Sequence, residues 1–139
     1  MIRNSAFAIL FFFFLFLCCN PSKEISDRLE LKITAEGSIN VIDAKKGQVI
    51  IKNLYAGYYQ NGINQSIKLK DQTKIEKTPF LDKMGEGTET ILNTTEEDQP
   101  IEVIWTLRTF KDKPALAGKL EITNKNNDEL RIDRLIPFY

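Results

Sequence analysis

Apolar and polar residues alternate along most of the chain after residue 30, and this period of two restricts the chain to β-strands. The clearest run covers residues 101–110, where β-branched and aromatic residues suit a half-buried pleated strand. No segment shows a competing helical period. Four apolar side chains of the clearest run share one face: Ile101, Val103, Trp105 and Leu107.

Short turns rich in Asn, Asp, Gly, Lys or Pro separate the expected strands. Apolar positions change face late in the last strand, so we expect a bulge near Asp133 or Arg134. The last three strands should form an antiparallel meander. We predict an all-β fold, an antiparallel β-sandwich of supersandwich-like type. The expected strands cover residues 29–34, 38–42, 48–54, 66–70, 89–93, 101–110, 116–124 and 130–138.

The N-terminal segment has the pattern of an export signal. Arg3 precedes an unbroken apolar run over residues 6–17, which matches the basic and apolar regions of a signal peptide. A bilayer-spanning helix needs about 20 apolar residues, so the run is too short to span comfortably. We divide the chain into a signal peptide (1–18), a polar tether (19–28) and one β-domain (29–139).

The end of the apolar run, Leu15-Phe16-Leu17-Cys18-Cys19, resembles a bacterial lipobox, in which an apolar triplet leads into a lipidated cysteine. The residue before that cysteine is small in the family, which favours Cys19 over Cys18. Stable anchoring needs two membrane signals, and such an N-terminus carries more than one acyl chain. An ordinary cleaved signal and an uncleaved short anchor remain the alternatives. The resemblance implies a bacterial envelope lipoprotein, periplasmic or on the outer surface.

Composition excludes several chemistries. The chain has no histidine, and its two cysteines both belong to the N-terminal segment. This removes Ser–His and Cys–His catalysis, disulfides in the domain, and nearly all zinc or iron sites. The 19 basic and 19 acidic residues form no basic patch, so nucleic acid is not an expected partner. We expect no cofactor, no metal and no catalytic residue.

The segment Tyr55–Gly62 is the candidate ligand site. Aromatic ring faces cover the C–H groups of a sugar while amides bond its hydroxyls, so Tyr55, Tyr58, Tyr59 and Asn61 are possible sugar contacts. A strand end and turn with packed tyrosines explains the same residues without function.

Two acidic segments can each be explained either by a functional site or by a turn. Carboxylates from Asp82 to Glu89 lie near a glycine pair, but a bend between strands accounts for them without an acid–base pair. The run Glu96-Glu97-Asp98 reads as a solvated turn, since it lacks the spacing of a calcium loop.

From residue 84 to 138 the order of features resembles the N-terminal β-sandwich of melibiase-type α-galactosidases. The resemblance covers about half of the domain, and each feature alone is common among β-sandwiches. The matching features are Gly85-Glu86-Gly87, an aromatic strand from Trp105 to Phe110, the turn Lys111-Asp112-Lys113-Pro114, the Thr123-Asn124 strand end, and an apolar strand ending near Pro137.

The resemblance implies a substrate class without a reaction. In that family two catalytic Asp residues sit in a (β/α)₈ barrel after the sandwich, and 139 residues hold no such barrel. The leading hypothesis is therefore a lipid-anchored, non-catalytic domain of a carbohydrate-degrading enzyme. The chain ends in apolar residues, so we expect an incomplete sandwich or one completed by a partner. The alternative is a stand-alone surface lipoprotein that binds a glycan or a protein.

Overall fold

The computed structural model describes residues 27–96, 100–126 and 129–138; the expected signal peptide, Cys19 and the first part of the tether lie outside them. The described residues form ten strands and no helix, and every strand pair is antiparallel. This confirms the predicted all-β, antiparallel class. The strands are β1 (Leu29–Ile33), β2 (Ile39–Asp43), β3 (Gln48–Leu54), β4 (Ala56–Gln60), β5 (Ile63–Ile67), β6 (Lys74–Asp82), β7 (Gly85–Thr95), β8 (Ile101–Phe110), β9 (Leu116–Asn124) and β10 (Arg134–Ile136).

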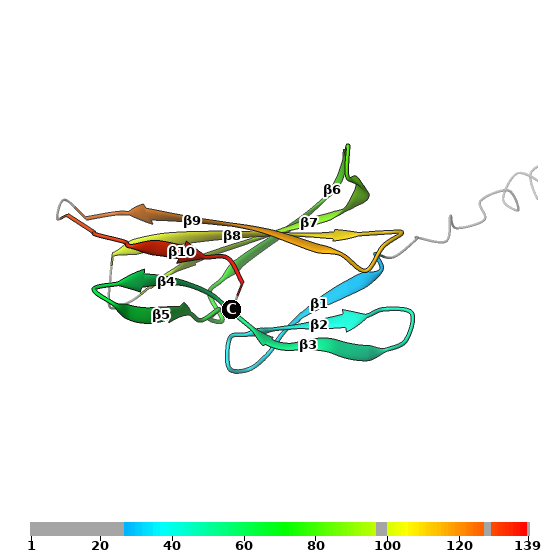
Figure 1. Ribbon diagram of the computed structural model, residues 1–139, viewed down its shortest axis with the longest axis horizontal. Helices are drawn as coiled ribbons and strands as arrows, with labels where there is room; N and C mark the ends of the chain where they lie inside the picture. Colours follow the sequence, from blue (N-terminus) through cyan, green and yellow to red (C-terminus); the bar gives the residue numbers. More distant parts are fainter. Residues whose placement is uncertain (1–26, 97–99, 127–128, 139) are drawn as a thin grey trace, which may run out of the picture.

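The strands form three sheets, in the orders β1-β2-β3, β10-β4-β5 and β6-β7-β8-β9. The four-stranded sheet runs along one side of the molecule, and the two smaller sheets lie next to one another on the other side (Figure 1). Buried side chains from all three sheets join in one hydrophobic core. The finer assignment to a supersandwich-like β-sandwich stays a prediction.

Strand β8 supplies the centre of this core. Its predicted inward face is confirmed, because all four of its apolar side chains are at most 1 % exposed. Burial of one large apolar side chain contributes about 1.5–3 kcal/mol, so this strand is a major source of stability. The buried set is Ile101, Val103, Trp105 and Leu107.

The predicted meander of the last three strands is wrong in its third member. Only Arg134–Ile136 forms a strand, β10, and it pairs with β4 in a different sheet instead of with β9. The change of apolar face near Asp133 therefore marks the start of a strand, and the β10–β4 register contains no bulge. The four-stranded meander is β6-β7-β8-β9, which puts β8 and β9 together as expected.

Besides β10, four strands differ from the expected set because their sequences lack alternation or were interpreted as turns. One is β7, which begins at Gly85 and so includes the glycine pair expected to form a bend before residue 89. Strand β6 was not predicted, since it is a sheet edge whose side chains are nearly all exposed on both faces. The segment read as a strand end and turn is the β4–β5 hairpin, closed by Asn61 and Gly62 at positive φ. Strand β5 begins at Ile63, earlier than the predicted residue 66.

A glycine brings two aromatic rings together on the outer face of the four-stranded sheet. Gly87 is paired with Phe80 on one side and Phe110 on the other. Without a side chain between them, these two rings meet edge to face with centroids 5.4 Å apart. A Cβ at Gly87 would overlap the carbonyl oxygen of Thr109. The contact leaves Phe110 only 1 % exposed.

We expect Gly87→Ala to lower the free energy of unfolding by about 2 kcal/mol, because the added methyl must displace backbone of β8. Gly47→Ala is the matched control: its φ is +64° and its added methyl meets nothing within 4 Å, so it costs only the backbone strain of about 1 kcal/mol. Urea unfolding measures both. Equal losses for the two variants would contradict the close packing at Gly87.

Candidate functional site

The structure does not bring the predicted sugar-binding tyrosines to one surface. Tyr58 and Tyr59 are adjacent on β4, so their side chains lie on opposite faces of the sheet. The Tyr58 ring belongs to the hydrophobic core and is 3 % exposed. Burial, with a smaller effect from the charge of Glu96, raises the pKa of its hydroxyl. The Tyr58 ring therefore offers no face to a ligand in this structure.

The other three residues of that prediction are more accessible. Tyr55 and Tyr59 are half-buried, and Asn61 is exposed in the β4–β5 turn. The guanidinium of Arg134 lies over the Tyr59 ring, 4.6 Å from its centroid. One face of that ring is thus already covered by a cation from β10.

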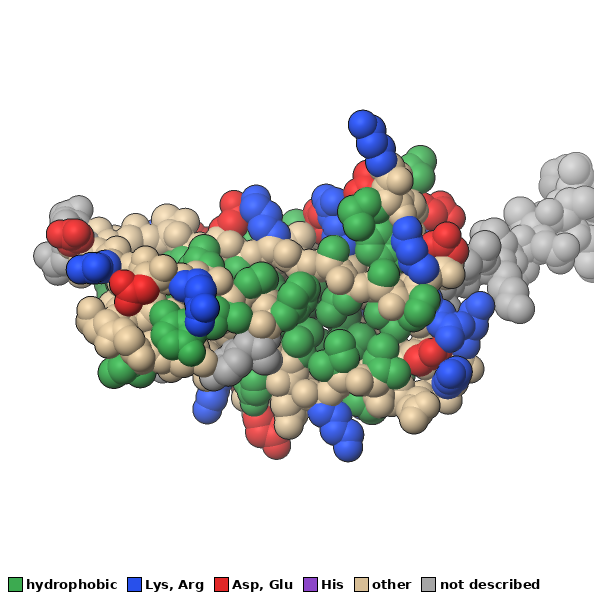
Figure 2. Space-filling view, viewed as in Figure 1, with side chains coloured by type: hydrophobic (Ala, Val, Ile, Leu, Met, Phe, Trp, Pro, Cys, Tyr) green, Lys and Arg blue, Asp and Glu red, His purple; other side chains and the backbone are tan. Residues whose placement is uncertain are grey.

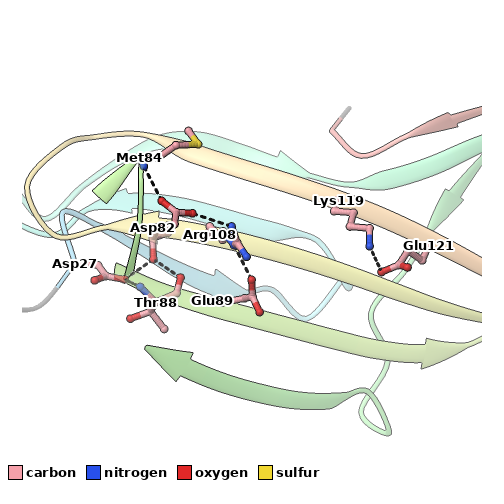
Figure 3. A network of polar contacts seen from close by, with 9 residues as sticks. Asp27, Asp82, Met84, Thr88, Glu89, Arg108, Lys119 and Glu121 are labelled. Atoms are coloured by element: carbon pink, nitrogen blue, oxygen red, sulfur yellow. Dashed lines mark hydrogen bonds and ion pairs between the residues drawn. The ribbon is translucent and has the colours of Figure 1, made fainter. Parts of the chain in front are cut away.

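An ion-pair cluster occupies the outer face of the four-stranded sheet (Figure 3). Arg108 donates from Nε to Glu89 at 2.6 Å and from Nη1 to Asp82 at 3.1 Å. Its guanidinium stacks on the Phe80 ring, 4.9 Å from the centroid. A depression of about 460 Å³ beside this cluster is lined by Glu89, Thr106, Arg108, Ala117, Gly118, Lys119 and Glu121.

These contacts give the acidic segment a structural role. Arg108 holds both Asp82 and Glu89, and Glu86 points to the other face, where it pairs with Lys111 at 3.5 Å. The three carboxylates do not face one another across a cleft. They cross-link strands β6, β7 and β8.

A second depression, which we call the β1–β6 groove, runs between the first strand and the edge strand β6. It consists of two adjoining hollows of about 400 and 250 Å³ that share Leu31, Lys77 and Thr90. The inner face of β7 forms its floor. Aliphatic side chains of β1 form one wall, and β6 forms the other with Ile75, which is 49 % exposed. The remaining lining residues are Asp27, Leu29, Glu30, Lys32, Ile33, Ile39, Ala44, Thr88, Leu92 and Thr109.

The backbone of β1 faces this groove. In the described part of the chain, β2 is the only sheet neighbour of β1. Hydrogen bonds to the β2 side fall at Arg28 and Thr34, and such pairs recur at every second residue of an antiparallel ladder. The N–H and C=O groups of Leu29, Leu31 and Ile33 therefore point away from β2. The groove is thus bordered by an open strand edge.

The groove is closed at one end by the first two described residues. The Asp27 carboxylate accepts hydrogen bonds from the Thr88 amide at 3.0 Å and the Thr109 hydroxyl at 2.5 Å. The Arg28 amide donates to the carbonyl of Phe110 at 2.8 Å. Asp27 and Arg28, which were expected to belong to the tether, are therefore part of the folded domain.

Arg28 also ties β1 to the turn between β2 and β3. It donates from Nη2 to Asp43 at 2.7 Å. Burial of the Asp43 carboxylate raises its pKa, but hydrogen bonds from the Lys46 amide, Arg28 and the Lys45 amide, together with the Arg28 charge, outweigh that effect. The pKa of Asp43 therefore lies below its ordinary value of 3.8.

Sequence reasoning missed the β1–β6 groove because β6 was not recognised. The residue types of β6 are those of an edge strand. Its lysines and proline, Lys74, Lys77 and Pro79, protect an exposed strand from pairing with other chains. The aliphatic alternation of β1 was recognised, but alternation alone does not reveal which strand edge stays open.

Comparisons with protein-family models, with curated proteins and with solved structures found no match to this chain. Between Asp27 and Phe138, leaving aside the short gaps in the description, no cluster of three or more His, Cys, Asp or Glu side chains is arranged to hold a metal ion. In the same residues no helix has the length and hydropathy needed to cross a membrane.

The lowered pKa of Asp43 predicts acid sensitivity. Its ionised form is favoured by folding, so its contribution to stability is complete above pH 3.8 and is lost as the pH falls through the lower native pKa. We expect Asp43→Asn to be less stable than the wild type at pH 7 and to lose less stability on acidification to pH 2. Urea midpoints measured across this range test it.

Arg28→Gln provides the graded comparison, because it removes the ion pair and leaves the amide hydrogen bonds of the turn intact. Its pH dependence should fall between those of the wild type and Asp43→Asn. Identical acid profiles for all three proteins would refute the assignment.

Proposed function

We propose that this chain is a lipid-anchored, non-catalytic β-domain of the bacterial envelope that binds an extended segment of a partner protein along β1. The carrying observation is the open edge of β1 beside an apolar groove. The lipid anchor at Cys19 rests on the lipobox resemblance.

The groove combines an open strand edge with an apolar wall, which is what an added strand requires. The inner face of β6 extends past β1 and leaves Ile75 49 % exposed. A segment paired with Leu29, Leu31 and Ile33 would extend the β1-β2-β3 sheet and cover that face. In strand addition, main-chain hydrogen bonds supply affinity and alternate side chains fill pockets. Apolar residues at every second position of the segment would enter the two hollows.

The lining favours a polypeptide over a glycan. None of the described residues that line the groove is aromatic, whereas sugar sites depend on ring faces. The predicted tyrosines lie elsewhere, and Tyr58 is in the core. Carbohydrate binding through Tyr59 and Asn61 remains the competing proposal.

The resemblance to melibiase-type α-galactosidases suggests a more specific partner. In support of it, β7 begins at Gly85, β8 and β9 join through residues 111–115, and β9 ends at Asn124. Against it, β10 leaves the β8–β9 sheet for β4. Under this second proposal, the segment that fills the groove belongs to a catalytic barrel, and an in-frame barrel in the downstream nucleotide sequence would support it.

A display library of linear ten-residue peptides, selected on the purified full chain, tests the first proposal. We expect enriched peptides to carry apolar residues at every second position and to protect the amides of Leu31 and Ile33 from hydrogen exchange. Leu31→Pro removes one edge N–H that does not bond β2 and should weaken peptide binding at least tenfold. Peptides without alternation, or no enrichment, would overturn strand addition.

Two variants separate the alternatives. Ile63→Lys changes an exposed apolar residue outside the groove and should leave peptide binding unchanged. Tyr59→Ala should also leave it unchanged. Retention of the wild type on immobilised galactosides or cell-wall glycans, lost in Tyr59→Ala and kept in Leu31→Pro, would favour the carbohydrate proposal instead.

A further inference from the structure

Three turns and the start of β1 meet at one end of the molecule, which we call the tether end. The β2–β3 turn is bonded to the start of β1 through the Ala44 amide and the Arg28 carbonyl, 3.0 Å apart. The β6–β7 turn is joined to the β8–β9 turn by a hydrogen bond from Lys113 to the Met84 carbonyl. Arg28 in turn bonds Phe110 at the end of β8. These contacts make the tether end one continuous surface.

Apolar and basic side chains are exposed together there. Leu81 is 81 % exposed, more than any other large hydrophobic residue described, and Met84 is 58 % exposed. Lys83 lies between them in sequence, at the tip of the hairpin. Figure 2 shows hydrophobic and basic side chains on this projecting tip, with further basic and acidic side chains along the same end. Lys45 and Lys46 are exposed in the β2–β3 turn.

Much of the acidic charge of this end is neutralised internally. Asp43 pairs with Arg28, Asp82 with Arg108, and Glu86 with Lys111. Within the described residues, the three exposed lysines form no ion pair, and two exposed acidic side chains, Asp112 and Glu30, remain without one. The unneutralised charge exposed at the tether end is therefore positive. The lysines concerned are Lys45, Lys46 and Lys83.

We propose that the tether end docks on the surface of an anionic bilayer, with the β6–β7 tip entering the headgroup region. Lysines near an anionic leaflet are attracted to its surface charge, and apolar side chains strengthen the binding by entering the interface. The proposal rests on the lipid anchor. Asp27 follows the tether in sequence, so an anchored chain would hold this end of the domain close to the membrane. Leu81 and Met84 are the residues that enter.

Tryptophan fluorescence in vesicles tests the docking. The full lipidated chain carrying Met84→Trp is reconstituted into vesicles of phosphatidylglycerol and phosphatidylethanolamine with brominated acyl chains. We expect at least twofold stronger quenching than for Ile63→Trp, whose exposed site begins β5. The turn of the β4–β5 hairpin lies at the end of the molecule opposite the β2–β3 turn (Figure 1). The native Trp105 is 1 % exposed and gives the same background in both.

Flotation with the vesicles reports the anchor separately from docking. Adding Lys45→Glu, Lys46→Glu and Lys83→Glu to Met84→Trp should leave flotation intact and reduce quenching to the Ile63→Trp level. Flotation with equal quenching at both sites would overturn docking and leave the anchor standing. If the protein does not float, the anchor proposal fails. In that case the same vesicles are titrated into the Met84→Trp chain and the tryptophan emission maximum is measured. A blue shift supports docking, and an unchanged spectrum overturns it.

Discussion

The hydrogen bonds of Asp27 and Arg28 join the two sides of the molecule just before β1. The Asp27 carboxylate reaches β7 and β8 in the four-stranded sheet, through Thr88 and Thr109. Arg28, in contrast, pairs with Asp43 of the smaller sheet. A charged acceptor makes stronger hydrogen bonds than a neutral one, so the short Asp27 contacts suit a corner that must fix one sheet against another. The same two residues directly precede β1.

The position of β1 leaves an edge unfilled. Arg28 fixes the start of β1 to the end of β8, and a hollow separates β1 from the edge strand β6. The inner face of β6 then has no strand beneath it, and Ile75 and Leu81 stay exposed. Edge strands normally carry charges and proline, as β6 does with Lys77 and Pro79. An apolar hollow beside an edge that is protected in this way fits the proposed binding of a partner segment.

The predictable part of this fold is the part with one buried face. Strands β8 and β9 show period-two patterns because one side packs on the core, and their bounds were predicted correctly. Strand β6 was not predicted because most of its residues are exposed on both faces. Such a strand has no buried face that would require alternating apolar residues. The pairing of β10 with β4 was also invisible, since sequence order favours neighbouring strands and β10 returns to a strand some 75 residues earlier. The groove depends on β6, which the alternation pattern of the sequence does not reveal.

The two proposed surfaces are compatible in one orientation. The β1–β6 groove begins at Asp27 and Thr109, at the tether end, and continues to Ile33 and Leu92 farther along the molecule. If the tether end rests on a bilayer, the groove opens at the side of the domain and runs away from the membrane surface. A partner segment would then enter from the aqueous side without displacing the anchor. Docking would also restrict the orientations of the anchored domain, so that the edge of β1 is presented in a fixed direction and less orientational freedom is lost when the partner binds.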